Sequence, residues 1–337
     1  MPPTFEEQAG QTLENVKAIV ENAGLTMEHV VYSQVYLENM ADYAVLNSVW
    51  KKYFSTAPPA RAVLGVARLP TDTPVEINAV AVRDLSQKKV LSNGAVMTRD
   101  RFFIPGVFGR DPHTGRIPDD PGAAVQSALD EMRRALEAGG LDLRHVVFVN
   151  PYLTDEMPME VMNRVYAKHF EFGNTPARAT IRVSGLPSGA HIEFTGVAVR
   201  DLLRRRAVRP KNMAPSATAS PCVFAGDTLY CSAKAGFIPG ANGGIYAETV
   251  DHQVRQTMRN LLDGLEEAGM DFSQVVASNV YLDNIDDFAG MNRIYGLYFK
   301  GAPPTRTTVQ PHAPAERRPD AAGRWPKLEE VSLVAVK

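Results

Sequence analysis

Three stretches of this sequence repeat one pattern, and an internal repeat constrains the fold more than any other feature. Proline, any residue and arginine are followed by an alternating apolar run that contains a glutamate. The pattern reads PPARAVLGVARLPTDTPVEIN at 58–78, TPARATIRVSGLPSGAHIEF at 175–194, and PPTRTTVQ at 303–310 with KLEEVSLVAVK at 327–337. Its arginine and glutamate are Arg61 and Glu76, Arg178 and Glu193, and Arg306 and Glu330. We therefore expect three related units.

Aligning the arginines also brings the preceding residues into register. Each copy has a helical pattern, found at 5–25, 122–141 and 249–270. Each pattern ends in a glycine, which is favoured where the backbone turns left-handed after a helix, and these are Gly24, Gly140 and Gly269. A β-branched run ending in Tyr-Leu follows and predicts a strand. The next helical segment carries an asparagine in each copy, namely Asn47, Asn163 and Asn292.

An opening hairpin distinguishes the copies. CVFAGDTLYC at 222–231 has Gly226-Asp227 as a two-residue turn, AVMTRDRFFIPG at 95–106 is a less regular version, and the first copy has no counterpart. A full unit should therefore run strand–strand–helix–strand–helix–strand–strand. This order predicts an α+β fold in which two helices cover one face of a mixed sheet. We place the units at 1–86, 87–204 and 205–337, with an insertion near 311–326.

Composition argues against several classes of protein. A formal net charge of −2 without a basic run argues against a nucleic-acid partner. No apolar stretch approaches the roughly 20 residues that span a bilayer, and MPPTFEEQ lacks the features of a secretory signal. Two cysteines favour a reducing, cytoplasmic location. The hairpin turn sets Cys222 opposite Cys231, so a bridge is geometrically possible, but we expect two reduced thiols.

These motifs resemble the RidA/YjgF family of enamine and imine deaminases. The matching residues are the three P-x-R triplets, the Leu-Pro that follows two of them, the endings EINAVAVRD (76–84) and IEFTGVAVRD (192–201), and the AG-L/M helix ends. The resemblance implies a chorismate-mutase-like fold. Family members usually form homotrimers with clefts between subunits. Three units in one chain are therefore expected to close as an intrachain pseudo-trimer, present as a monomer or a dimer.

The resemblance also implies the residues of the cleft. In the family, the arginine grips the substrate carboxylate, and a glutamate, a Ser-Gly pair, an asparagine and a tyrosine complete the site. Ser232 matches the serine, Ala233 replaces its glycine, the second copy has Pro105-Gly106, and we find no counterpart of the tyrosine. We expect unequal clefts, of which the third copy's carries most of the function; the alternative is a cleft between units that takes its arginine from one copy and its glutamate or serine from the next. The expected catalytic residues are Arg306, Glu330, Glu193 and Glu76, and the expected substrate-binding residues are Arg61, Arg178, Ser232, Asn47, Asn163 and Asn292.

The chemistry of this family suits these residue types. A guanidinium holds a carboxylate through two parallel hydrogen bonds, and a fixed carboxylate can orient water and exchange protons with it. An imine needs only water and proton transfer, so we expect no metal or cofactor. The substrate should be a small carboxylate whose imine or enamine is hydrolysed to an oxo-acid and ammonia.

Other interpretations stay open at this point. One alternative is that the arginines and glutamates form structural ion pairs and bind no substrate. A non-catalytic metabolite-binding protein would keep the arginine after losing the catalytic residues, and a hydrolase or lyase with a specialised pathway substrate would use the insertion to set specificity. The insertion itself is either a solvated loop or a lid.

Overall fold

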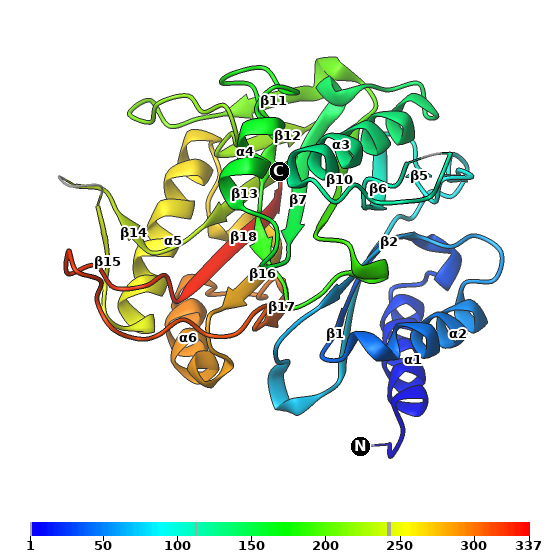
Figure 1. The fold of residues 1–337 in the computed structure, drawn as a ribbon, viewed down its shortest axis with the longest axis horizontal. Helices are drawn as coiled ribbons and strands as arrows, with labels where there is room; N and C mark the ends of the chain where they lie inside the picture. Colours follow the sequence, from blue (N-terminus) through cyan, green and yellow to red (C-terminus); the bar gives the residue numbers. More distant parts are fainter. Residues whose placement is uncertain (1, 112, 241–243) are drawn as a thin grey trace.

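The computed structural model describes residues 2–111, 113–240 and 244–337. It consists of three α+β units grouped around a common centre, with the strands inside and the main helices outside (Figure 1). The elements of unit 1 are α1 (Phe5–Asn22), β1 (Val30–Leu37), α2 (Tyr43–Tyr53), β2 (Ala60–Gly65) and β3 (Val75–Ala81). Strand β2 lies parallel and β3 antiparallel to the central strand β1, which gives the order β2-β1-β3.

Units 2 and 3 share a longer strand order. Unit 2 contains β4 (Lys89–Val90), β5 (Val96–Met97), β6 (Arg101–Val107), α3 (Pro121–Glu137), β7 (Val146–Leu153), α4 (Met159–Tyr166), β8 (Ala177–Arg178), β9 (Ile181–Arg182) and β10 (Ile192–Val199). Unit 3 contains β11 (Arg205–Val208), β12 (Cys222–Ala225), β13 (Thr228–Lys234), β14 (Phe237–Ile238), β15 (Ile245–Tyr246), α5 (Val250–Glu267), β16 (Val275–Leu282), α6 (Phe288–Tyr295), β17 (Thr305–Val309) and β18 (Glu329–Val336).

The sheet of unit 2 has the order β4-β5-β6-β10-β7-β8, with β9 also on β7, and that of unit 3 has the matching order β11-β12-β13-β18-β16-β17. Strands β14 and β15 form a separate two-stranded ribbon. The repeated strand order confirms the α+β fold and the opening hairpins. Strands β4 and β11, which extend each hairpin by one strand, are elements that the sequence pattern did not predict.

The three helix-ending glycines behave as expected. Gly24, Gly140 and Gly269 have φ of +74°, +74° and +72°, in the left-handed region that side chains with a Cβ rarely adopt. After the first helix, the amide of Leu25 donates to the carbonyl of Val20, so a carbonyl that the helix leaves without a partner is satisfied. The glycines therefore end the long helix of each unit at an equivalent point.

The central strands supply two different cores because their side chains alternate between the two faces. On β1, Val35 and Leu37 pack beneath the helices of unit 1 with Trp50. The intervening Tyr36 points to the middle of the molecule, where it joins Tyr152 and Tyr281 from the equivalent strands β7 and β16. All eight residues of β1 are buried, which is the pattern of a strand covered on both faces.

Equivalent tyrosines from the three units thus meet at one centre. The exposed fraction is 0% for Tyr36 and Tyr152 and 4% for Tyr281. The side-chain amide of Gln34 donates to the hydroxyl of Tyr152 at 2.5 Å, and the hydroxyl of Tyr36 donates to the Gln34 carbonyl oxygen at 3.0 Å. The first bond joins units 1 and 2, and the packing of all three tyrosines in one buried cluster brings unit 3 to the same centre, so the chain forms the expected intrachain pseudo-trimer.

Unit 1 leaves one interface of the pseudo-trimer uncovered. The hairpins of units 2 and 3 help to bury Val31 on β1 and Val147 on β7, both 0% exposed. The equivalent Val276 on β16 is 47% exposed, and residues 2–86 form no hairpin that covers it. Strand β3 correspondingly has an open edge, with Val80 44% exposed. Open edges of this kind are where sheets pair with further strands.

The hairpin of unit 3 confirms one expectation and corrects another. Cys222 lies opposite Cys231, and Ala225 lies opposite Thr228, as the turn predicts. The two cysteines form a disulfide instead of the expected pair of reduced thiols. Direct cross-strand pairing brings their Cα atoms to 4.0 Å, close enough for a bridge. With the two cysteines bridged, the small number of cysteines no longer favours a reducing compartment.

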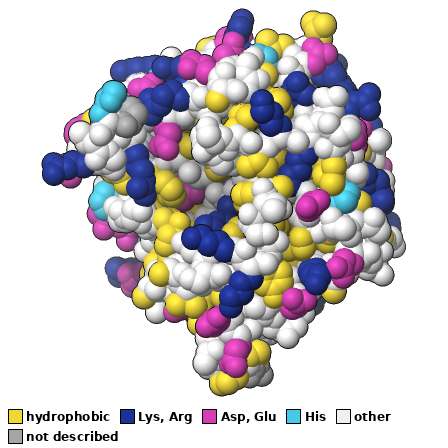
Figure 2. Space-filling view, turned by 90° about the vertical axis from the view of Figure 1, so that its right-hand side faces the viewer, with side chains coloured by type: hydrophobic (Ala, Val, Ile, Leu, Met, Phe, Trp, Pro, Cys, Tyr) yellow, Lys and Arg dark blue, Asp and Glu magenta, His cyan; other side chains and the backbone are white. Residues whose placement is uncertain are grey.

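The surface carries both charge signs. On the face shown in Figure 2, Lys and Arg side chains are interspersed with Asp and Glu and with hydrophobic residues. Among the described residues, no helix is both long enough and apolar enough to cross a membrane.

The open interface leads to a prediction about stability. Val276→Lys should change the free energy of unfolding by less than about 0.5 kcal/mol, because the new ammonium remains in water. Val147→Lys, at the equivalent but buried position, should cost about 3 kcal/mol or more, because it buries an unpaired charge. Urea unfolding of both variants followed by circular dichroism tests this. Equal losses would mean that Val276 is covered in solution, and light scattering would then show whether a second chain covers it.

Candidate active site

The arginine of each repeat lies on the strand beside the central strand and points towards the helices of its own unit. The Arg61 guanidinium donates to Asn47 Oδ1 at 2.6 Å and lies 4.8 Å above the ring of Trp50. Arg178 donates to Asn163 Oδ1 at 2.8 Å and lies 5.1 Å above Tyr166. A carbonyl acceptor and an aromatic face together fix the orientation of a guanidinium. Two of the three expected asparagines therefore position their arginine.

Arg306 is held differently. Its guanidinium lies 5.0 Å from the ring of Tyr295 and 5.6 Å from that of Phe288. Within the described residues, no hydrogen bond joins it to Asn292. The third asparagine thus occupies the expected place on α6 without contacting the arginine that it was expected to support.

Strand geometry prevents an arginine from meeting the glutamate of its own unit. On the two sides of β1, Arg61 pairs with Ser33 and Glu76 pairs with Tyr36. Ser33 and Tyr36 are three residues apart, so their side chains, and those of the residues paired with them, point to opposite faces of the sheet. The other units have the same registers. The expected grouping of Arg306 with Glu330 in one cleft is therefore wrong.

The carboxylate that acts electrostatically on each arginine instead belongs to another unit. We call the pairs cleft A, cleft B and cleft C, formed respectively by Arg61 with Glu193, Arg178 with Glu330, and Arg306 with Glu76. Burial lowers the pKa of each of these arginines, and the carboxylate of the other unit acts in the opposite direction. All six residues of the sequence pattern thus lie at boundaries between units, in combinations that cross the copies.

Cleft A is closed around an isolated carboxyl group. Glu193 is 0% exposed, and neither of its carboxyl oxygens has a hydrogen-bond partner in the described structure. Burial raises the pKa of Glu193 well above its usual range, although Arg61 opposes the shift. The side chain packs against Gly106, where an added methyl group would lie 2.1 Å from the carboxyl oxygen Oε1. Only glycine fits beside the carboxyl group in this position.

Cleft B carries an alanine where cleft A has this glycine. In both hairpin strands two residues bulge between the paired positions, Pro105-Gly106 in β6 and Ser232-Ala233 in β13. A carboxyl group placed as in Glu193 would collide with the methyl group of Ala233. Glu330 lies elsewhere and accepts a hydrogen bond from Lys327. One methyl group thus accounts for the different orientation of the two glutamates.

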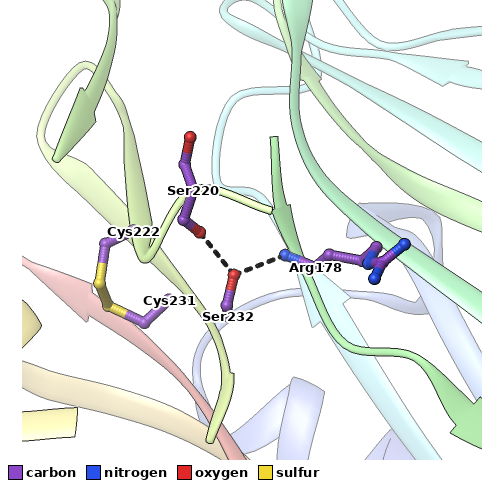
Figure 3. The surroundings of a disulfide bond; sticks show 5 residues. All are labelled: Arg178, Ser220, Cys222, Cys231 and Ser232. Carbon is purple, nitrogen blue, oxygen red and sulfur yellow. Dashed lines mark hydrogen bonds between the residues drawn. A yellow bond between two sulfur atoms is a disulfide. The ribbon is translucent and has the colours of Figure 1, made fainter. Parts of the chain in front are cut away.

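Ser232 has a structural role in this arrangement. Its hydroxyl accepts a hydrogen bond from the Arg178 backbone amide at 2.8 Å and donates to the Ser220 carbonyl at 2.6 Å. Figure 3 shows this hydroxyl directed at the backbone of Arg178, while the guanidinium points away from it. The first bond joins unit 3 to β8 of unit 2, and the second lies within unit 3, beside the disulfide.

A cavity of about 580 Å³ opens beside Glu330. Small-molecule sites usually have volumes of about 300–1,000 Å³. Charged, polar and aromatic side chains from unit 3 line it, namely Lys234, Lys327, Asp263, Asn260, Phe237 and Tyr246. None of these six residues is predicted from the sequence motifs. The side-chain amide of Asn260 donates to the carbonyls of Ala235 and Phe237 and fixes the loop at the cavity wall.

Cleft C is the most open of the three. Unit 1 supplies Glu76 but has no hairpin strand to cover the cleft. Partial burial raises the pKa of Glu76 from 4.5 to about 7, while Thr307 and Arg306 oppose the shift. A carboxyl group that titrates near neutral pH is suited to proton transfer, but the described structure shows no wall opposite it.

The insertion is mostly exposed along 313–324. Arg317 contacts Asp287 at the start of α6, and Pro319 and Trp325 line a second hollow of about 550 Å³ against the β14–β15 ribbon. The Pro326 carbonyl accepts a hydrogen bond from Gln253, next to Lys327 of the cleft B cavity. The insertion thus reaches the cavity only at its end.

The protein-family model described as Endoribonuclease L-PSP matches residues 1–83, 86–200 and 210–316. The chain belongs to this family. The three separate matches show that the family unit occurs three times, and they confirm the resemblance inferred from the motifs. Each match spans about one unit of the chain.

Two curated relatives illustrate this. A RutC family protein of Saccharolobus solfataricus is 46% identical over 77 residues, which are 23% of this chain and 61% of that protein. The 2-iminobutanoate/2-iminopropanoate deaminase of Escherichia coli is 42% identical over 86 residues, 25% of this chain and 67% of that protein. The aligned part thus spans somewhat less than two thirds of the first of these relatives.

One solved structure matches nearly the whole chain. A chorismatase crystal structure aligns with a TM-score of 0.61 and 12% identity, covering 92% of this chain and 93% of its own. At this identity the likeness concerns the fold, which is therefore shared along almost the full length.

The glycine of cleft A can be tested by a double-mutant cycle. Gly106→Ala should cost about 1–3 kcal/mol of stability, because the new methyl group overlaps the Glu193 carboxyl group. The cost should be smaller in a Glu193→Ala background, because the overlapping group is then absent. Ala233→Gly serves as the matched control and should cost at most about 1 kcal/mol. Additive effects of the Gly106 and Glu193 substitutions in urea unfolding would contradict the proposed contact.

Glu76 should make stability depend on pH. Its pKa is about 7 in the folded chain against 4.5 as the reference, so between these values the folded state binds more protons than the unfolded state. Its contribution is present below about pH 4.5 and is lost as the pH rises towards 7. Glu76→Gln should remove this component, whose slope is at most about 1.4 kcal/mol per pH unit.

Urea midpoints measured from pH 5 to pH 8 test this, with the exposed Glu137→Gln as control. Parallel curves for wild type and Glu76→Gln would show that Glu76 titrates normally.

Proposed function

We propose that this protein hydrolyses imines or enamines of small carboxylic acids to oxo-acids and ammonia, and that cleft B is its active site. The observation that carries the proposal is the cavity of about 580 Å³ lined by Glu330 of unit 3, next to a unit boundary where the Arg178 backbone is bonded to Ser232 and the Glu330 carboxylate acts electrostatically on the Arg178 guanidinium. Membership of the family and the relationship to a bacterial imine deaminase support it.

The residues of cleft B suit the steps of this reaction. Arg178, oriented by Asn163 and Tyr166, binds the substrate carboxylate with two hydrogen bonds. Glu330, held by Lys327, takes a proton from water as the water oxygen bonds to the imine carbon. The resulting carbinolamine receives that proton on nitrogen. Glu330 then transfers the hydroxyl proton to the nitrogen, the C–N bond breaks as the C=O bond forms, and ammonia leaves.

The other two clefts fit this chemistry less well. In cleft A, the Glu193 carboxyl group is fully buried against Gly106, away from solvent. In cleft C, Arg306 lacks the asparagine contact and unit 1 has no hairpin strand to form a wall. We therefore assign the main function to Arg178 in place of Arg306, which had been expected from grouping the residues by copy.

A second candidate function is non-catalytic binding of a small carboxylate. The observation that favours it is the use of the Ser232 hydroxyl in two backbone hydrogen bonds, which withdraws it from a substrate. Ala233 in place of glycine adds to this difference. A protein of this kind would keep the Arg178 anchor and the cavity without turnover.

Substitution of the three arginines separates the clefts. Arg178→Ala should cost about 2–5 kcal/mol of transition-state binding, because it removes one partner of a close charge pair. Arg178→Lys should restore little, since an ammonium lacks the two-pronged geometry. Arg61→Ala and Arg306→Ala are the matched controls from the other clefts and should cost less.

The assay is ammonia release from freshly generated 2-iminobutanoate, with oxo-acid binding measured in parallel. Near wild-type activity of Arg178→Ala together with an inactive Arg306→Ala would overturn the assignment of cleft B. Binding that depends on Arg178 without any ammonia release would support the binding protein instead.

A further inference from the structure

The cavity beside Glu330 is larger than a four-carbon imine requires. Its volume is about 580 Å³, and Phe237 and Tyr246 form aromatic walls with ring centroids 5.7 Å apart. Both rings belong to the β14–β15 ribbon. The cavity therefore accommodates a longer substrate than the simplest imine, and its charged groups identify the kind of group that the extension would carry.

Lys234 is the unexpected charge in this cavity. It ends strand β13 at the position that corresponds to the buried Val107 of unit 2, so a cation here replaces an apolar side chain. Among the described residues, no hydrogen bond or ion pair involves the Lys234 ammonium. Burial lowers the pKa of Lys234, which Glu330 and Asp263 oppose. An ammonium in this setting is stabilised by an anion that arrives with a ligand.

The acidic neighbours of Lys234 already have other partners. The Glu330 carboxylate is bound by Lys327, and that of Asp263 lies 3.0 Å from the Arg259 guanidinium. Lys234 thus remains the cation that is available to a ligand in the cavity. Lys234 and Glu330 line the same cavity, and the Arg178 backbone amide is bonded to Ser232, two residues before Lys234 on β13. A substrate that extends past Glu330 therefore meets a cation at each end.

We propose that Lys234 binds a second carboxylate of the substrate, so that cleft B selects the imines of 2-oxo dicarboxylic acids. This inference rests on the proposed function of cleft B. The first carboxylate lies at Arg178, the imine carbon next to Glu330, and the second carboxylate at Lys234. Lys234 is thus a specificity-determining residue, whereas Arg178 and Glu330 serve any imine that the cleft accepts.

The test compares two stable oxo-acid products as probes, 2-oxoglutarate and 2-oxobutanoate, by titration calorimetry at constant ionic strength. Wild type should bind 2-oxoglutarate about tenfold or more tightly than 2-oxobutanoate, since it gains one charge contact. In Lys234→Met the ratio of the two dissociation constants should fall to near one, with the loss mainly on 2-oxoglutarate. Lys89→Met removes an exposed charge on the edge strand β4 and should leave the ratio unchanged.

The outcomes separate this inference from the proposed function. Equal binding of the two acids by wild type, or an unchanged ratio in Lys234→Met, overturns the role of Lys234, even when 2-iminobutanoate is hydrolysed and Arg178→Ala is inactive. Absence of both oxo-acid binding and ammonia release overturns the proposed function and the role of Lys234 together. Circular dichroism of Lys234→Met confirms that a changed ratio comes from a folded protein.

Discussion

Side-chain alternation along the strands is the constraint on which the candidate sites depend. Within a unit, the arginine points towards the helices and the glutamate towards the other units, because their register partners on the central strand are three residues apart. No unit can therefore assemble a cleft by itself. Tyr36, Tyr152 and Tyr281 pack together where the three units meet. The same association of units places each arginine near a boundary with the unit that supplies its glutamate.

The three clefts began from one sequence pattern and differ through small local changes. Cleft A has a glycine that admits the carboxyl group of Glu193 into the protein interior. In cleft B, the methyl group of Ala233 excludes that position, and Glu330 lies next to a cavity. In cleft C, the described residues of unit 1 form no hairpin beside Glu76, which is partly exposed. Burial, more than the identity of the charged pair, distinguishes these sites.

Much of the fold could be predicted from local patterns, because those patterns have local causes. The glycines after the long helices and the cross-strand pairing of Cys222 with Cys231 follow from backbone conformation and turn length. The grouping of the site residues could not be predicted in this way. It depends on strand register across loops and on contacts between units, neither of which is visible in one copy of the motif.

The residues that sequence reasoning missed share a related cause. Lys234 of β13 differs in character from its equivalent in unit 2, which is the apolar Val107 of β6. This difference is seen only when the two strands are compared in register. A lysine at the end of a strand is otherwise ordinary. Ser232 was read as a substrate contact because its neighbours match the family, yet its hydroxyl bonds to the backbone of another unit. The disulfide likewise depends on redox conditions that a count of cysteines does not specify.

Joining the units covalently has a consequence for how such a site can change. In a homotrimer, every substitution appears three times. An ammonium introduced into a cavity such as that of Lys234 would therefore be buried in all three clefts at once, and each cleft would be destabilised. Here it appears once per molecule, and the remaining clefts are free to serve as scaffold. The linkage also makes assembly intramolecular, so the boundary between units 2 and 3 persists at dilutions where separate subunits would dissociate.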